Sequence, residues 1–179
     1  MVEVRTPWSL RRPDLFIAES AMSLSILRVQ RDDVQAATSL GAAFDVHWPL
    51  TPNTIVEVGF RVACLAPGEW ALFAPADQIA GQIAQACSGR LHHLADVSAG
   101  RRLWRVSGAA SRAVIAKGCS LDTHPSVMTG VHCAQSLLTQ APVLLVAQPA
   151  ISTFDIVADA SFAGHLRAWF TQAAQEFIP

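Results

Sequence analysis

The sequence predicts an α+β fold built from two related halves, in which helices pack on one face of a mainly antiparallel sheet. Residues 79–86 align with residues 162–169, and both segments space their apolar side chains as an amphipathic helix does. Each segment also follows a strand-like apolar run, at residues 70–73 and 154–157. We favour an internal duplication as the explanation. The alternative is a chance similarity between two alanine-rich helices.

Apolar periodicity and turn residues place further elements along the chain. Helices are expected after Asp32 and after Ser107, because both side chains suit an N-cap position. Turns are expected at residues 67–68 and 148–149. Each half then runs strand, helix, strand, hairpin, strand, helix, which is the ferredoxin-like split β-α-β arrangement. Strands are expected at residues 24–29, 55–65, 70–73, 91–97, 103–106, 131–138, 143–147 and 154–158.

The length and composition indicate an ordered chain with its own hydrophobic core. It has 179 residues, of which 51% are hydrophobic and 15% are charged, so intrinsic disorder is excluded. The two halves, residues 24–98 and 101–179, are expected to form a single compact unit. Residues 1–23 lie outside the repeat and are expected to form an N-terminal arm.

This arm is expected to dock on another chain, with packing against its own domain as the alternative. It holds a tryptophan and several arginines beside prolines that stiffen it. Tryptophan and arginine are enriched where the binding energy of an interface concentrates. The loop over residues 48–53 has a similar exposed but apolar character. The predicted partner interface comprises Trp8, Arg11, Arg12 and Trp48.

The charge, hydropathy and cysteine content exclude some classes of binding partner and indicate the cellular compartment. Lysine and arginine number 13 against 14 aspartate and glutamate, which leaves no positive excess to neutralise nucleic-acid phosphates. The longest apolar stretch, residues 141–147, is far shorter than the ~20 residues that span a bilayer. Four widely spaced cysteines are typical of unpaired thiols in a reducing compartment, so the predicted location is cytoplasmic.

No pattern in the sequence assembles a catalytic site. The Gly-x-Ser-x-Gly and Gly-x-Gly-x-x-Gly motifs are absent. Lys117 stands at the end of a predicted helix, where a cation interacts favourably with the helix dipole. One cluster of side chains contains residue types that bind zinc. It has no Cys-x-x-Cys or His-x-x-x-His pair, which would hold two ligands on one element. We predict no catalytic, cofactor-binding or metal-ligating residue. The zinc candidates are Cys119, Asp122, His124, His132 and Cys133.

Several segments together resemble one known family. They are Leu-Ala-Pro-Gly-Glu-Trp-Ala-Leu-Phe at 65–73, Asp-Val-Ser at 96–98, Trp-Arg-Val-Ser-Gly at 104–108, Ala-Lys-Gly-Cys-Ser-Leu-Asp at 116–122, Phe-Asp-Ile-Val at 154–157 and Ser-Phe-Ala-Gly-His-Leu-Arg-Ala-Trp at 161–169. In their order and spacing these segments are similar to the gamma subunit family of heterotetrameric sarcosine oxidases. The resemblance covers residues 55–176.

The resemblance implies a fold like that of the glycine-cleavage T-protein and related folate-binding domains, which agrees with a duplicated α+β chain. It implies a non-catalytic gamma subunit of a complex that demethylates sarcosine oxidatively to glycine, transfers the one-carbon unit to tetrahydrofolate and produces H2O2. The implied partners are the alpha, beta and delta subunits, of which alpha is contacted most directly and stabilised in its folate-binding part. FAD, FMN, NAD, tetrahydrofolate and zinc are implied on those subunits, with none on this chain.

A stand-alone folate-binding protein resembling an aminomethyltransferase is the alternative function. The T-protein relatives carry a working carboxylate in an acidic segment, whereas residues 134–140 here are Ala-Gln-Ser-Leu-Leu-Thr-Gln. This difference weighs against independent aminomethyl transfer. Which N-methylated amino acid the complex would use is left open, because a subunit without the active site carries no substrate specificity.

Overall fold

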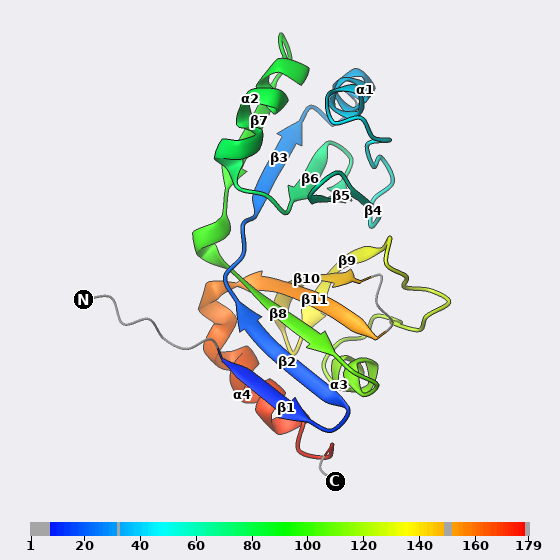
Figure 1. The fold of residues 1–179 in the computed structure, drawn as a ribbon, viewed down its shortest axis with the longest axis vertical. Coiled ribbons are helices and arrows are strands. Elements are labelled where there is room, and N and C mark those ends of the chain that lie inside the picture. The colour runs from blue at the N-terminus through cyan, green and yellow to red at the C-terminus, as the bar shows by residue number, and fades with distance from the viewer. Residues whose placement is uncertain (1–7, 32, 149–151, 178–179) are drawn as a thin grey trace, which may run out of the picture. The chain divides into compact units, whose positions relative to one another are not determined.

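The chain folds into two compact units, shown in Figure 1. The computed structural model describes residues 8–31, 33–148 and 152–177. The first unit comprises residues 22–99 together with residues 131–134. The second unit contains the remaining residues, so it draws on both ends of the chain. No helix in these described ranges is long and apolar enough to cross a membrane.

The first unit is a five-stranded antiparallel sheet with two helices. Its strands lie in the order β4-β5-β6-β3-β7, and every neighbouring pair is antiparallel. The elements, in chain order, are β3 (Ser25–Val29), α1 (Val34–Ala43), β4 (Ile55–Glu57), β5 (Arg61–Ala66), β6 (Glu69–Leu72), α2 (Ala76–Ala86) and β7 (His92–Asp96). Apolar side chains from both helices and from the strands form one buried cluster, which includes Ala37, Leu40, Val62, Trp70, Ile79 and Ile83.

Helix α1 begins at a side-chain cap that also forms an ion pair. The carboxylate of Asp33 accepts a hydrogen bond from the backbone N–H of Ala36 at 2.9 Å. The same carboxylate accepts two hydrogen bonds from Arg90, at 2.7 and 2.9 Å. The hydrogen bond from Arg90, and then that from Ala36, lowers the pKa of Asp33 below its ordinary value. Asp32, the cap expected from the sequence, lies outside the described residues.

We expect the substitution Asp33→Asn to reduce the loss of stability in acid. A carboxyl group whose pKa is lower in the folded state contributes stability above its unfolded pKa of about 3.9. That contribution disappears as the pH falls through the folded pKa. Asparagine still caps the helix but carries no charge. Urea unfolding between pH 7 and pH 2.5 should therefore show a shallower pH dependence for Asp33→Asn than for the wild type.

The matched control is Asp45→Asn, because Asp45 is exposed and has no ion-pair partner among the described residues. This variant should follow the wild-type pH dependence. A wild-type slope in Asp33→Asn would show that the ion pair with Arg90 contributes nothing to acid sensitivity.

The second unit is a six-stranded sheet with two helices. Its strand order is β1-β2-β8-β11-β10-β9. The elements, in chain order, are β1 (Ser9–Arg12), β2 (Leu15–Ser20), β8 (Arg101–Ser107), α3 (Ser111–Ala116), β9 (Cys133–Leu138), β10 (Ala141–Ala147), β11 (Thr153–Asp159), the 3-10 turn η2 (Ala160–Phe162) and α4 (Ala163–Ala173). The first two residues of β9 are grouped with the first unit, and the 3-10 turn η1 (Ser98–Gly100) begins in the first unit and ends in the second. Both α3 and α4 contact one face of this sheet, since Arg112 lies over the ring of Phe154 and Arg167 pairs with Glu19.

The two sheets share one strand order, which confirms the duplicated α+β fold. Reading inward from one edge, β4-β5-β6-β3-β7 in the first unit corresponds to β9-β10-β11-β8-β2 in the second. The last position is filled differently in the two units. In the first unit, the strand at this position is β7, which follows α2 directly in the chain. In the second unit, it is β2, which comes from the start of the chain.

Residues 9–20 therefore form two strands of the second sheet, whereas the sequence suggested an arm outside both halves. Strand β2 pairs with β8 over five residues, and β1 pairs with β2 as a hairpin. Leu15, Ile17 and Glu19 are buried and alternate with more exposed neighbours. Figure 1 shows β2, in blue, beside the green strand β8, with β1 on the other side of β2. The physical reason is that β8 would otherwise present an unpaired edge, and β2 covers this edge.

A buried carboxylate ties this hairpin to α4. Glu19 is only 6% exposed, and its Oε1 accepts a hydrogen bond from Nη2 of Arg167 at 2.8 Å. Arg102 Nε lies 4.0 Å from the same oxygen. A buried charge requires such partners, because an unpaired carboxylate would be strongly destabilising.

Two further expectations differ from the structure. The strand expected at residues 55–65 is two strands, because Gly59 has a φ of 82° and the chain reverses there. Ser107 ends β8, and α3 starts after Ala110 without a side-chain cap. Lys117 ends α3 as its C-cap residue, as expected, and in addition its Nζ donates to the carbonyl of Ala173 in α4 at 2.6 Å.

Candidate functional site

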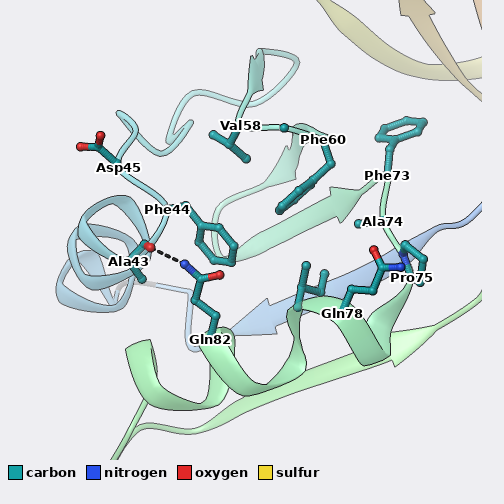
Figure 2. A pocket seen from close by; sticks show the side chains of 12 residues that line it. Ala43, Phe44, Asp45, Val58, Phe60, Phe73, Ala74, Pro75, Gln78 and Gln82 are labelled. Atoms are coloured by element: carbon teal, nitrogen blue, oxygen red, sulfur yellow. Dashed lines mark hydrogen bonds between the residues drawn. The ribbon is translucent and has the colours of Figure 1, made fainter.

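A hollow opens between the end of α1 and the start of α2 in the first unit (Figure 2). Its volume is about 570 Å³. Four short segments contribute to it, and two of them are chain reversals. Asp45 has a φ of 51° just after α1, and Gly59 has a φ of 82° between β4 and β5. The lining residues are Ala43, Phe44, Asp45, Val58, Gly59, Phe60, Phe73, Ala74, Pro75, Gln78, Ile79 and Gln82.

Aromatic rings make up much of the wall. The rings of Phe44 and Phe60 pack edge to face, with centroids 5.6 Å apart. Phe73 lines the pocket from the end of β6, and Arg61 lies over its ring at 4.6 Å. Such edge-to-face pairs are favourable beyond the burial of their area. The wall therefore suits an apolar or aromatic group.

Two glutamines of α2 supply the polar side of the pocket. Nε2 of Gln82 donates a hydrogen bond to the carbonyl of Ala43, which links α2 to the end of α1. Gln78 lies one turn earlier on the same helix, beside Pro75. The carboxylate of Asp45 points away from the hollow in Figure 2. Amide groups can orient a ligand by hydrogen bonds but cannot move a proton at neutral pH.

The lining lacks the groups that a reaction centre needs. None of the lining residues is a histidine, cysteine, lysine or serine, so no nucleophile stands beside a base. The lining offers apolar contact and the two side-chain amides of Gln78 and Gln82 for hydrogen bonding.

Buried titratable groups elsewhere have structural partners or are kept neutral. Burial raises the pKa of the Cys133 thiol to about 12 and also raises the pKa of Cys64 and Cys87. These thiols are therefore protonated at neutral pH and are poor nucleophiles. Asp155 is fully buried, and it accepts hydrogen bonds from Arg105 at 2.8 and 2.9 Å and from Gln148 at 2.7 Å.

The zinc candidates do not come together in the structure. Asp122 instead accepts a hydrogen bond from the backbone N–H of His124 at 2.8 Å, which is a local turn contact. Across the described residues, no three histidine, cysteine, aspartate or glutamate side chains form a group that could hold a metal ion.

The four predicted interface residues are divided between the units. Trp8 is partly buried, and its ring stacks on Phe170 of α4 with centroids 6.5 Å apart. Arg11 is exposed and lies over the ring of Phe16 at 4.6 Å. Arg12 donates to the backbone carbonyl of Arg11 at 3.0 Å. All of these residues belong to the second unit.

The loop at residues 48–53 is exposed from Leu50 onward, as predicted, but Trp48 is buried. It is 3% exposed and belongs to the buried cluster of the first unit, where its ring contacts those of Phe44 and Trp70. The next residue, Pro49, accepts a hydrogen bond from the indole of Trp70 at 2.7 Å. The burial of Trp48 therefore contributes to the stability of the first unit.

Residues 28–176 match the model of the "Sarcosine oxidase, gamma subunit family". The chain belongs to this family. Two curated gamma subunits agree with this assignment. One, from Arthrobacter sp., is 30% identical over 132 residues, which are 70% of this chain and 64% of that protein. The other, from Corynebacterium sp. (strain P-1), is 33% identical over 121 residues, which are 66% of this chain and 59% of that protein. The alignments thus span about three fifths of the length of these relatives.

Solved structures show the same fold as this gamma subunit family member. A chain of the heterotetrameric sarcosine oxidase from Corynebacterium sp. U-96 superposes with a TM-score of 0.82 at 22% identity, covering 95% of this chain and 88% of that one. The aminomethyltransferase T of the glycine cleavage system from Bartonella henselae superposes with a TM-score of 0.64 at 14% identity, covering 89% of this chain and 45% of that one. The expected T-protein-like fold is confirmed.

The residues of the pocket were not predicted from the sequence. Phe44, Phe60 and Phe73 follow three different elements and share no period. The two backbone reversals at Asp45 and Gly59 bring them together. For one of these reversals the sequence contained a signal, because Gly59 separates two short apolar runs within residues 55–65.

Proposed function

We propose that this chain is the gamma subunit of a heterotetrameric sarcosine oxidase and serves as a non-catalytic structural subunit. The observation that carries the proposal is the family match over residues 28–176. In the proposed complex, sarcosine is demethylated oxidatively to glycine, the one-carbon unit passes to tetrahydrofolate, and H2O2 is produced. This chain stabilises the folate-binding part of the alpha subunit and has beta and delta subunits as further partners.

The proposal assigns the cofactors to the other subunits. FAD, FMN, NAD, tetrahydrofolate and zinc belong to alpha, beta and delta in this assignment. The complex is placed in the cytoplasm, which the four free, buried cysteines support.

The stand-alone aminomethyltransferase is not favoured. The family model and both curated relatives are gamma subunits. The T-protein likeness, at 14% identity and 45% coverage of that protein, concerns the fold.

Co-expression of a tagged copy of this chain with the alpha, beta and delta subunits of the same organism tests the proposal. We expect all four chains to elute together in equal amounts and to oxidise sarcosine. A chain that elutes as a stable monomer while the other three assemble would contradict a structural role in the complex.

A titration separates the two functions further. Calorimetry of the isolated chain with tetrahydrofolate at millimolar concentration should give no binding heat, and the assembled complex is the positive control. Stoichiometric binding to the isolated chain would favour the folate-binding alternative.

A further inference from the structure

A second apolar surface of the first unit lies along α1. Two hollows of about 230 and 300 Å³ open along this helix. Ala37 and Leu50 line both hollows, so these two residues join them into one groove. We call this surface the α1 groove. Beyond the shared residues, its lining includes Arg31, Val34, Gly41, Trp48, Pro67 and Trp70.

The α1 groove exposes large aliphatic side chains to solvent. Val34 is 66% exposed and Leu50 is 49% exposed. Only six large hydrophobic side chains in the described part of the chain are exposed, and two of them flank this one groove. Scattered single apolar side chains on a surface are ordinary, whereas apolar side chains grouped around a hollow mark a binding surface.

A cation without an ion-pair partner stands at one end of the groove. Arg31 lines the smaller hollow, is exposed, and forms no ion pair with the other described residues. Asp33, which also lines this hollow, is already neutralised by Arg90 at 2.7 Å. Among the described residues at this end, the charge without an ion-pair partner is therefore positive, and a carboxylate on the occupant would complement it.

The shape of the groove favours a helix as the occupant. The smaller hollow lies against Val34 and the larger against Gly41, about two turns or ~10 Å apart along α1, with Ala37 shared between them. Apolar side chains at positions i, i+3 or i+4 and i+7 of an amphipathic helix span the same length on one face. An added strand would need an open sheet edge, whereas this groove is lined by a helix and loops.

We infer that the α1 groove docks an amphipathic helix of another subunit of the assembly, which places aliphatic side chains in the two hollows and a carboxylate at Arg31. This inference rests on the proposed function, because that assembly supplies the partner. Ala37 and Gly41 are buried, and the exposed aliphatic side chains that the docked helix would contact are those of Val34 and Leu50.

The four-chain complex provides the test. Leu50→Glu and Val34→Glu should each weaken assembly at least tenfold in a titration of this chain into the other three subunits. Arg31→Glu should weaken it about fivefold at low salt, with a smaller effect at 0.5 M salt because charge pairs are screened. Val127→Glu is the matched control, since Val127 is 53% exposed but belongs to the second unit. Thermal unfolding of each isolated variant checks that the fold is retained.

A photo-cross-linking amino acid in place of Val34 identifies the occupant. We expect a cross-link to a partner-subunit segment with aliphatic residues at helical spacing and a nearby carboxylate. A cross-link to a second copy of this chain would overturn the inference. So would wild-type assembly by folded Leu50→Glu and Val34→Glu, and the proposed function would then still stand. Failure of the wild-type chain to assemble would overturn both.

Discussion

The substitution Gly108→Ala should destabilise the second unit by about 3 kcal/mol. Gly108 follows β8 and has a φ of 106°, a conformation that residues with a Cβ rarely adopt. A Cβ at this position would lie 2.3 Å from the carbonyl oxygen of Asp14, in the turn between β1 and β2. Backbone strain of about 1–2 kcal/mol and overpacking of about 1–3 kcal/mol contribute together. Urea unfolding followed by tryptophan fluorescence measures the loss.

Gly59→Ala separates the two contributions. Gly59 also has a positive φ, 82°, but a Cβ there would meet no atom within 4 Å. This control should show the strain alone, about 1–2 kcal/mol. Equal losses for Gly59→Ala and Gly108→Ala would mean that the close approach to Asp14 carries no energetic cost.

Ile17→Ala should cost about 3 kcal/mol, although Ile17 lies in the segment that the sequence suggested was an arm. Its side chain is fully buried, and in the sheet it pairs with Val106 of β8 and Leu10 of β1. Removing an isoleucine side chain down to alanine in a packed core costs ~2–5 kcal/mol. Guanidinium unfolding of the isolated chain, compared with the wild type at pH 7, measures the change.

The neighbouring substitution Phe16→Ala provides the matched control. Phe16 occupies the same strand but points to the opposite face and is only partly buried. Its loss should cost less than half as much as that of Ile17, despite the larger side chain. If both substitutions left stability unchanged, residues 9–20 would not be an integral part of the sheet.

Strands whose own residues form a long apolar run were predictable from the sequence. Residues 143–147 and 154–158 were expected as strands, and the structure has Ala141–Ala147 and Thr153–Asp159. Their apolar runs are long and are bounded by turn residues, so the local sequence contains the whole signal. The aligned segments at residues 79–86 and 162–169 likewise became α2 and α4, because both carry helical periodicity.

Contacts between distant parts of the chain were not predictable in this way. Glu19 interrupts the apolar alternation of β2, and it is buried only because Arg167, 148 residues away, supplies a partner. Trp48 was expected to be exposed beside prolines. It reaches the core because Gly41 of α1 leaves room where the chain returns after the helix, with the Trp48 backbone nitrogen 3.6 Å from where a Cβ of Gly41 would be.

The position of β2 in the second sheet has a consequence for biosynthesis. Phe16 in β2 and Ser107 in β8 are 91 residues apart in the chain. At a synthesis rate of about 5–20 residues per second, the ribosome needs roughly 5 to 18 seconds to make the partner strand after β2 emerges. Meanwhile most of the first unit, residues 22–99, is completed between them. Until β8 is synthesised, the aliphatic side chains of the β1–β2 hairpin are therefore exposed to water in the nascent polypeptide. A chaperone can bind them during this time.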